Sequence, residues 1–71
     1  MATIKYRKTS LGFELVEISI AEQGICLKAD EDFQLWTLWD TVSGVLSEAE
    51  DIMRDNNIDF CTDFTVIKVA D

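Results

Sequence analysis

The feature that most constrains the fold is a stripe of apolar residues with the spacing of an amphipathic helix. From residue 35 to residue 53 the apolar positions step by three and four; they are Leu35, Leu38, Trp39, Val42, Val45, Leu46, Ala49, Ile52 and Met53. At about 100° per residue these positions share one side of a helix, while acidic and small residues occupy the other. The stripe therefore predicts one helix whose apolar face packs on another layer of structure.

The ends of this helix are marked by capping residues. Asp32 could cap the start, or Thr37 could do so with Asp40 as its partner in a capping box. The two asparagines at 56–57 suit the end of the helix, because asparagine tolerates the left-handed conformation. The Ser-Gly pair at 43–44 would allow a break into two shorter helices, but the stripe keeps its phase there and favours one helix.

The remainder of the chain has the period of β-strands. Apolar and polar residues alternate near residues 3–7, 13–20 and 25–29, with short turns between these segments, and strand-like sequence returns from about residue 60 to residue 69. Three strands joined by short turns predict an antiparallel meander. The whole chain, residues 1–71, is thus expected to form one small α+β domain of order β-β-β-α-β, with one helix packed on one face of an antiparallel sheet.

Two of the predicted strands change phase along their length. In the second strand Phe13 and Leu15 fall on one parity, while Val16, Ile18 and Ile20 fall on the other; the last strand shows a similar change. Either a β-bulge near Leu15 and Val16 restores the phase, or these strands carry apolar residues on both faces. Because one helix covers only one face, the second alternative requires a partner or a second copy of the chain.

Charge is distributed unevenly along the sequence. The net charge is −8, and residues 30–63 hold ten acidic residues against Arg54 alone, whereas residues 1–13 carry three basic residues and no acid. Such a field repels phosphate backbones and anionic membranes and attracts basic protein surfaces. Direct binding to nucleic acid or to membranes is therefore not expected. Only two cysteines and no apolar run long enough to span a bilayer favour a reducing cytoplasm.

Catalytic and metal-binding chemistry has little support in this sequence. Histidine is absent and no nucleophile or phosphate-loop motif is present, so no enzymatic activity, cofactor or metal is expected. The loop from Asp55 to Asp59 resembles half of an EF-hand, but Phe60 occupies the position of its required glycine. Glu14 and Glu17 are not expected to share a face of their strand, and Cys26 and Cys61 are expected to be at least half-buried.

Six residues are the candidates for partner binding. The acidic side of the helix supplies four of them, and two aromatic residues that fall off the apolar stripe supply the others: Asp40, Glu48, Asp51, Asp55, Phe33 and Trp36. Trp39 lies on the stripe and is expected in the core. A small domain of this size gains little net stability from its own core, so a bound partner would also stabilise it.

The leading hypothesis is a small acidic interaction protein that inhibits a partner by binding its basic surface. Carboxylates would mimic the phosphates of a nucleic acid, as they do in some small virus-encoded inhibitors of host defence; that comparison rests on size and charge alone. The alternative is a homodimeric structural or regulatory module that binds through an apolar sheet face. A third hypothesis, a small-ligand carrier, requires a cavity around Tyr6, Trp36 and Trp39.

Overall fold

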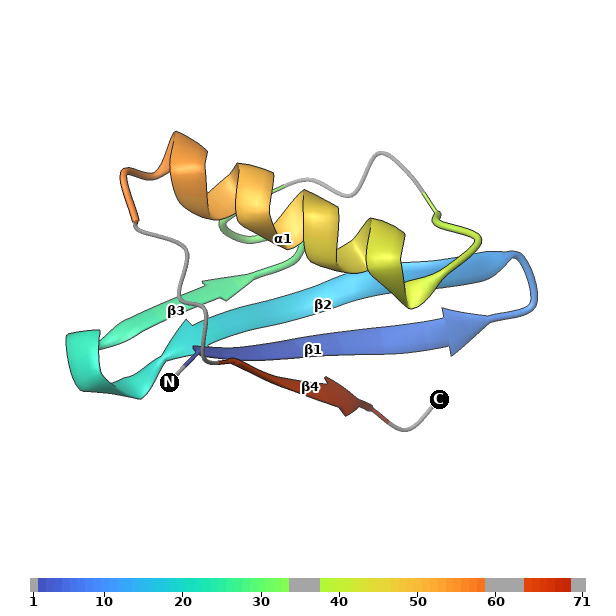
Figure 1. The fold of residues 1–71 in the computed structure, drawn as a ribbon, viewed down its shortest axis with the longest axis horizontal. Coiled ribbons are helices and arrows are strands. Elements are labelled where there is room, and N and C mark those ends of the chain that lie inside the picture. Colours follow the sequence, from blue (N-terminus) through green and yellow to red (C-terminus); the bar gives the residue numbers. More distant parts are fainter. Residues whose placement is uncertain (1, 34–37, 59–63, 70–71) are drawn as a thin grey trace.

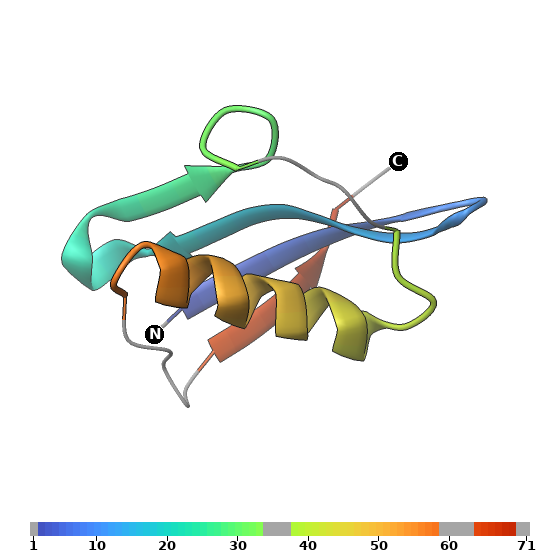
Figure 2. The same cartoon turned by 90° about the horizontal axis from the view of Figure 1, so that it is seen from above.

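The order of elements confirms the α+β fold with one helix on a small sheet. The computed structural model describes residues 2–33, 38–58 and 64–69. The elements in chain order are β1 (Ala2–Thr9), β2 (Gly12–Ile20), the short 3-10 helix η1 (Ala21–Gln23), β3 (Ile25–Lys28), α1 (Val42–Asp55) and β4 (Phe64–Lys68). The four strands form one sheet of order β3-β2-β1-β4, and α1 lies across one face of it (Figures 1 and 2).

The sheet is mixed, so the prediction of a wholly antiparallel sheet is wrong at its last strand. Strands β1, β2 and β3 form the predicted antiparallel meander. Strand β4 instead pairs in parallel with β1, with Phe64 opposite Ala2 and Lys68 opposite Tyr6. The cause is the crossover: β3 runs in the same direction as β1, and α1 returns the chain to the end of the sheet at which β3 begins, so β4 runs in that direction beside β1.

A β-bulge explains the change of phase in β2. Lys5 pairs with Glu17 and Tyr6 pairs with Leu15, so Val16 is the extra residue. The fully buried apolar side chains of this strand thereby share the face that α1 covers: Leu15, Ile18 and Ile20. The first of the two alternatives is confirmed, and coverage of β2 on both faces is wrong.

The last strand also leaves its second face uncovered among the described residues. In β4 the half-buried Phe64 and Val66 alternate with Thr65 and Ile67, and Ile67 is 40% exposed.

The core lies between α1 and the sheet and consists of eight buried residues: Ala2, Ile4, Leu15, Ile18, Ile20, Val45, Ala49 and Met53.

The helix begins later than its apolar stripe. Thr41 is the N-cap, and its hydroxyl accepts a hydrogen bond from the backbone N–H of Gly44 at 3.4 Å. A start at Asp32 is therefore wrong, and Thr37 lies outside the described residues. The reason is Trp39, whose backbone N–H and C=O both bond to Phe13, at 2.8 and 2.7 Å, and so continue the sheet beside β2. Gly44 lies in the first turn, and the helix continues through it without a break.

The end of α1 is the predicted asparagine stop. Asn57 has φ 59°, in the left-handed region. Its N–H donates to the carbonyl of Arg54 and the N–H of Ile58 donates to that of Met53, at 3.1 and 2.8 Å. These two bonds form a Schellman motif, which satisfies carbonyls that the helix end would otherwise leave unpaired.

In the described part of the chain, no helix has the length and apolar character needed to cross a bilayer.

Candidate functional site

Two ion pairs cover the face of the sheet that points away from α1. Lys5 Nζ lies 3.4 Å from Glu17 Oε2, and Arg7 Nη1 lies 3.0 Å from Glu14 Oε1. Lys5 and Arg7 are two residues apart in β1, so their cross-strand partners share one face. The expectation that Glu14 and Glu17 occupy different faces is wrong, because the bulge at Val16 restores the phase between them.

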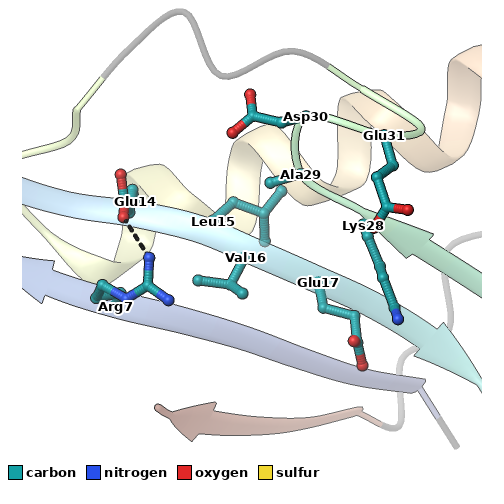
Figure 3. Close-up of a pocket in the computed structure, with 9 residues that line it drawn as sticks. All are labelled: Arg7, Glu14, Leu15, Val16, Glu17, Lys28, Ala29, Asp30 and Glu31. Carbon is teal, nitrogen blue, oxygen red and sulfur yellow. Dashed lines mark hydrogen bonds and ion pairs between the residues drawn. The ribbon is translucent and has the colours of Figure 1, made fainter. Parts of the chain in front are cut away.

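A cavity of about 360 Å³ opens on this same face, between the bulged part of β2 and the chain that follows β3 (Figure 3). Its lining combines charged and apolar groups: Arg7, Glu14, Leu15, Val16, Glu17, Lys28, Ala29, Asp30 and Glu31. The N–H of Ala29 donates to the carbonyl of Val16 at 2.9 Å, which joins the bulge to the segment after β3. The volume is at the lower end of the range for small ligand sites, about 300–1,000 Å³.

The loop from Lys28 to Phe33 forms one wall of the cavity and is held by its own hydrogen bonds. Asp32 Oδ2 accepts from the N–H of Lys28 at 2.8 Å, and the Lys28 carbonyl accepts from the N–H groups of Glu31 and Asp32 at 3.2 and 2.8 Å. The N–H of Asp30 donates to the Phe33 carbonyl at 2.7 Å. Asp30 has φ 65°, a left-handed conformation that aspartate tolerates better than most residues.

These hydrogen bonds also protect one end of the β3 edge of the sheet, at Lys28. In β3 the side of Lys28 that faces away from β2 is occupied by the loop, so its N–H and C=O cannot pair with another strand. An edge that is blocked in this way resists pairing with other chains. Cys26 is exposed because it points to the face that α1 does not cover, so the expectation of a buried thiol is wrong for this residue, and Cys61 lies outside the described residues.

The predicted acidic candidates do not form one equivalent set. Asp40, Asp51 and Asp55 are exposed, but Glu48 is half-buried. Glu48 Oε1 accepts a hydrogen bond from Trp39 Nε1 at 3.0 Å, which ties the chain before the helix to the helix itself. Asp51 Oδ1 lies 3.0 Å from Arg54 Nη1, and Glu50 also pairs with this arginine, at 3.2 Å. Within the described residues, Asp40 and Asp55 are thus the exposed carboxylates of the predicted set that have no ion-pair partner.

The aromatic candidates occupy different environments. Phe33 is half-buried and packs against the core, so much of its ring is unavailable to a partner. Trp36 lies outside the described residues. Trp39 packs against the core, as predicted, although from an extended segment and not from the helix. Tyr6 packs edge-on against Phe13, with 5.8 Å between ring centroids, and neither Tyr6 nor Trp39 lines the cavity on the open face.

Metal binding has no preassembled site in the described ranges, where no three His, Cys, Asp or Glu side chains are grouped closely enough to hold an ion.

Comparison of the chain with protein-family models, with curated proteins and with solved structures gave no match. The chemistry of the two faces and of the cavity is therefore the basis for a functional proposal.

The cavity was not anticipated from the sequence, although part of its signal is present there. Basic residues alternate along β1 and glutamates stand in the first half of β2, so a hairpin pairs them across the two strands. That complementarity identifies the open face as charged. The fold of the loop over β2 depends on backbone hydrogen bonds between separate segments and has no comparable sequence signal.

Proposed function

We propose that this protein is an interaction module that binds a basic surface of a partner protein through its exposed carboxylates. The observation that supports the proposal is that half of the basic side chains form ion pairs within the chain. Lys5, Arg7 and Arg54 are each paired with a carboxylate of the same chain. These pairs leave the net charge of the chain at −8, so the field that a partner meets is negative.

The carboxylates that remain are accessible and belong to two regions. Asp30 and Glu31 stand on the loop after β3, and Asp40 and Asp55 stand at the two ends of the helix. All four are exposed, and none has an ion-pair partner within the described residues. Complementary charge of this kind accelerates encounter with a basic partner and rejects acidic ones.

A basic groove that normally holds nucleic acid is the surface that such a protein would block. Carboxylates supply the negative charge that phosphates supply in a nucleic acid, and the uneven charge along the chain favours one orientation of binding. We place this activity, as an inhibitor of the partner, in a reducing compartment such as the cytoplasm, which is compatible with the exposed free thiol of Cys26.

The test is the salt dependence of binding to a partner captured from the native source. Affinity should fall steeply between about 50 and about 500 mM NaCl, and a duplex or single-stranded nucleic acid should compete. A variant with Asp40→Asn and Asp55→Asn should bind more weakly, and a Ser43→Ala, Ser47→Ala variant on the same helix should bind normally. An affinity that stays constant across this salt range would contradict the proposal.

The homodimer alternative has less support from the structure. It requires an apolar second face on the sheet, but β1 and β2 present two ion pairs there. Desolvating such pairs in an interface costs much of what their attraction contributes. Light scattering on the purified protein at micromolar concentration distinguishes the two hypotheses. The homodimer hypothesis requires a stable dimer, and the acidic interaction module does not.

A further inference from the structure

The cavity on the open face combines some apolar surface with a net negative charge. Val16 and Ala29 contribute apolar surface, and Asp30 and Glu31 contribute exposed carboxylates that have no ion-pair partner within the described residues. A side chain with an aliphatic stem and a cationic head fits both parts, since its stem can cover apolar surface while its charge meets the carboxylates.

The charges around the cavity favour a cation over an anion. Four carboxylates and two cations line it. Of the two cations, Arg7 is already bound to Glu14 at 3.0 Å, whereas Lys28 has no ion-pair partner within the described residues, since Glu17 opposite it pairs with Lys5 at 3.4 Å. The unpaired groups that remain in the lining are the carboxylates of Asp30 and Glu31 and the single ammonium of Lys28, so their net charge favours an incoming cation over a phosphate or carboxylate.

The backbone that carries these two carboxylates is also ordered before any ligand arrives. Hydrogen bonds at 2.7 to 3.2 Å fix the backbone of the loop on both sides of Asp30 and Glu31. A wall that is already ordered loses little conformational entropy on binding, so more of the interaction contributes to affinity.

We propose that this cavity receives an arginine side chain of the basic partner, an inference that rests on the function proposed above. The guanidinium presents several donors in one plane and is weakly hydrated, which suits adjacent carboxylates better than a compact ammonium. Arginine is also over-represented among the residues that dominate binding energy in protein interfaces. Asp30 and Glu31 bind the guanidinium, and Val16 and Ala29 contact its stem.

The experiment is a titration of the isotope-labelled protein with an arginine hexapeptide, followed by the backbone amide resonances at low salt. A citrulline hexapeptide is the matched control, because citrulline has the shape of arginine without its charge. The amides of Val16 and of residues 29–31 should shift and saturate with the arginine peptide and should not respond to the citrulline peptide.

Two double variants with equal charge change separate the cavity from the general field. Asp30→Asn, Glu31→Gln removes two charges at the cavity, and asparagine keeps the left-handed conformation accessible at residue 30. This variant should bind the arginine peptide up to about tenfold more weakly, from two exposed charge contacts. Glu50→Gln, Asp51→Asn removes two charges on the helix, at carboxylates that pair with Arg54, and should change the affinity less than about twofold. Thermal unfolding of both variants verifies that they are folded.

The possible results distinguish this inference from the proposed function. The cavity assignment would be overturned if the two double variants weakened peptide binding equally, or if the resonance shifts were spread along α1. Either result would still agree with the proposed function, an acidic protein that binds basic partners. A wild-type protein that does not bind the arginine peptide at low salt would contradict both. Shifts confined to the cavity, lost with Asp30→Asn, Glu31→Gln alone, would support the assignment.

Discussion

At the scale of single residues, contacts of Trp39 decide where the helix can begin. A Cβ added to Gly44 would lie 2.5 Å from Cε3 and 2.9 Å from Cβ of Trp39. The tryptophan therefore occupies the space that any other residue at position 44 would need. At Gly12, an added Cβ would lie 2.7 Å from the Trp39 carbonyl oxygen, and φ there is +147°. Glycines at both places allow one extended residue to bridge β2 and α1.

Substitution Gly44→Ala should lower the free energy of unfolding. Alanine improves helix propensity by about 1 kcal/mol at most, but the clash with the indole of Trp39 costs about 1–3 kcal/mol. Urea denaturation should show a net loss. Ser47→Ala, at an exposed position of the same helix, is the control and should change stability by about 0.5 kcal/mol or less. A Gly44→Ala protein as stable as the wild type would mean that Trp39 is not held against this turn.

The carboxylate of Glu48 should stabilise the fold and not only add charge. Glu48→Ala removes the acceptor for Trp39 Nε1–H and should cost about 1 kcal/mol in urea denaturation. Glu48→Gln keeps the acceptor oxygen while it removes the charge, so its stability should remain within about 0.5 kcal/mol of the wild type. If the two variants are equally stable, the hydrogen bond contributes nothing measurable.

At the scale of elements, the bulge in β2 has the largest consequence. Without Val16, the sequence from Phe13 to Ile20 alternates without interruption between residues that face α1 and residues that face away. The bulge thus adds one residue to the open face, beside the cavity, and leaves the buried side of the strand unchanged.

Deletion of Val16 should therefore be tolerated. The pairs of Lys5 with Glu17 and of Tyr6 with Leu15 become consecutive in a regular ladder, and the main loss is the hydrogen bond from Ala29, about 1 kcal/mol. Deletion of Ser19 is the control, because it shifts the buried Ile20 toward the open face. Urea denaturation should show that the first variant is clearly more stable than the second, and the reverse order would refute this account of the register.

At the scale of the whole molecule, charge repulsion is the property to test. The net charge is −8, and the described ion pairs lie at the surface, where each contributes about 0–1 kcal/mol. Long-range repulsion between the remaining carboxylates opposes folding and is screened by salt.

Moderate sodium chloride should consequently raise the melting temperature by a few degrees between about 50 and about 500 mM. The Asp40→Asn, Asp55→Asn variant carries less charge and should show a smaller increase. The same salt should weaken a complex with a basic partner, so stability and binding change in opposite directions. A melting temperature that falls on addition of salt would show that the ion pairs outweigh the repulsion.

Local patterns in the sequence were sufficient for the helix face, the helix end and the meander. The apolar stripe from Val42 to Met53 specifies which side of α1 packs, because side chains three and four apart share a face of any helix. The stop at Asn57 depends on one residue that adopts a left-handed conformation. Both are properties of a few neighbouring residues, which explains why no tertiary information was needed.

The tertiary structure alone decided the start of the helix, the parallel pairing of β4 and the cavity. Leu38 and Trp39 continue the apolar stripe, yet Trp39 is held in an extended segment by two hydrogen bonds to Phe13, more than twenty residues away. The sequence allowed either a bulge at Val16 or a strand with apolar residues on both faces, and only the register with β1 distinguished them. In each case the structure depends on interactions between groups that are distant in the chain. A local sequence pattern does not indicate which distant groups will come into contact.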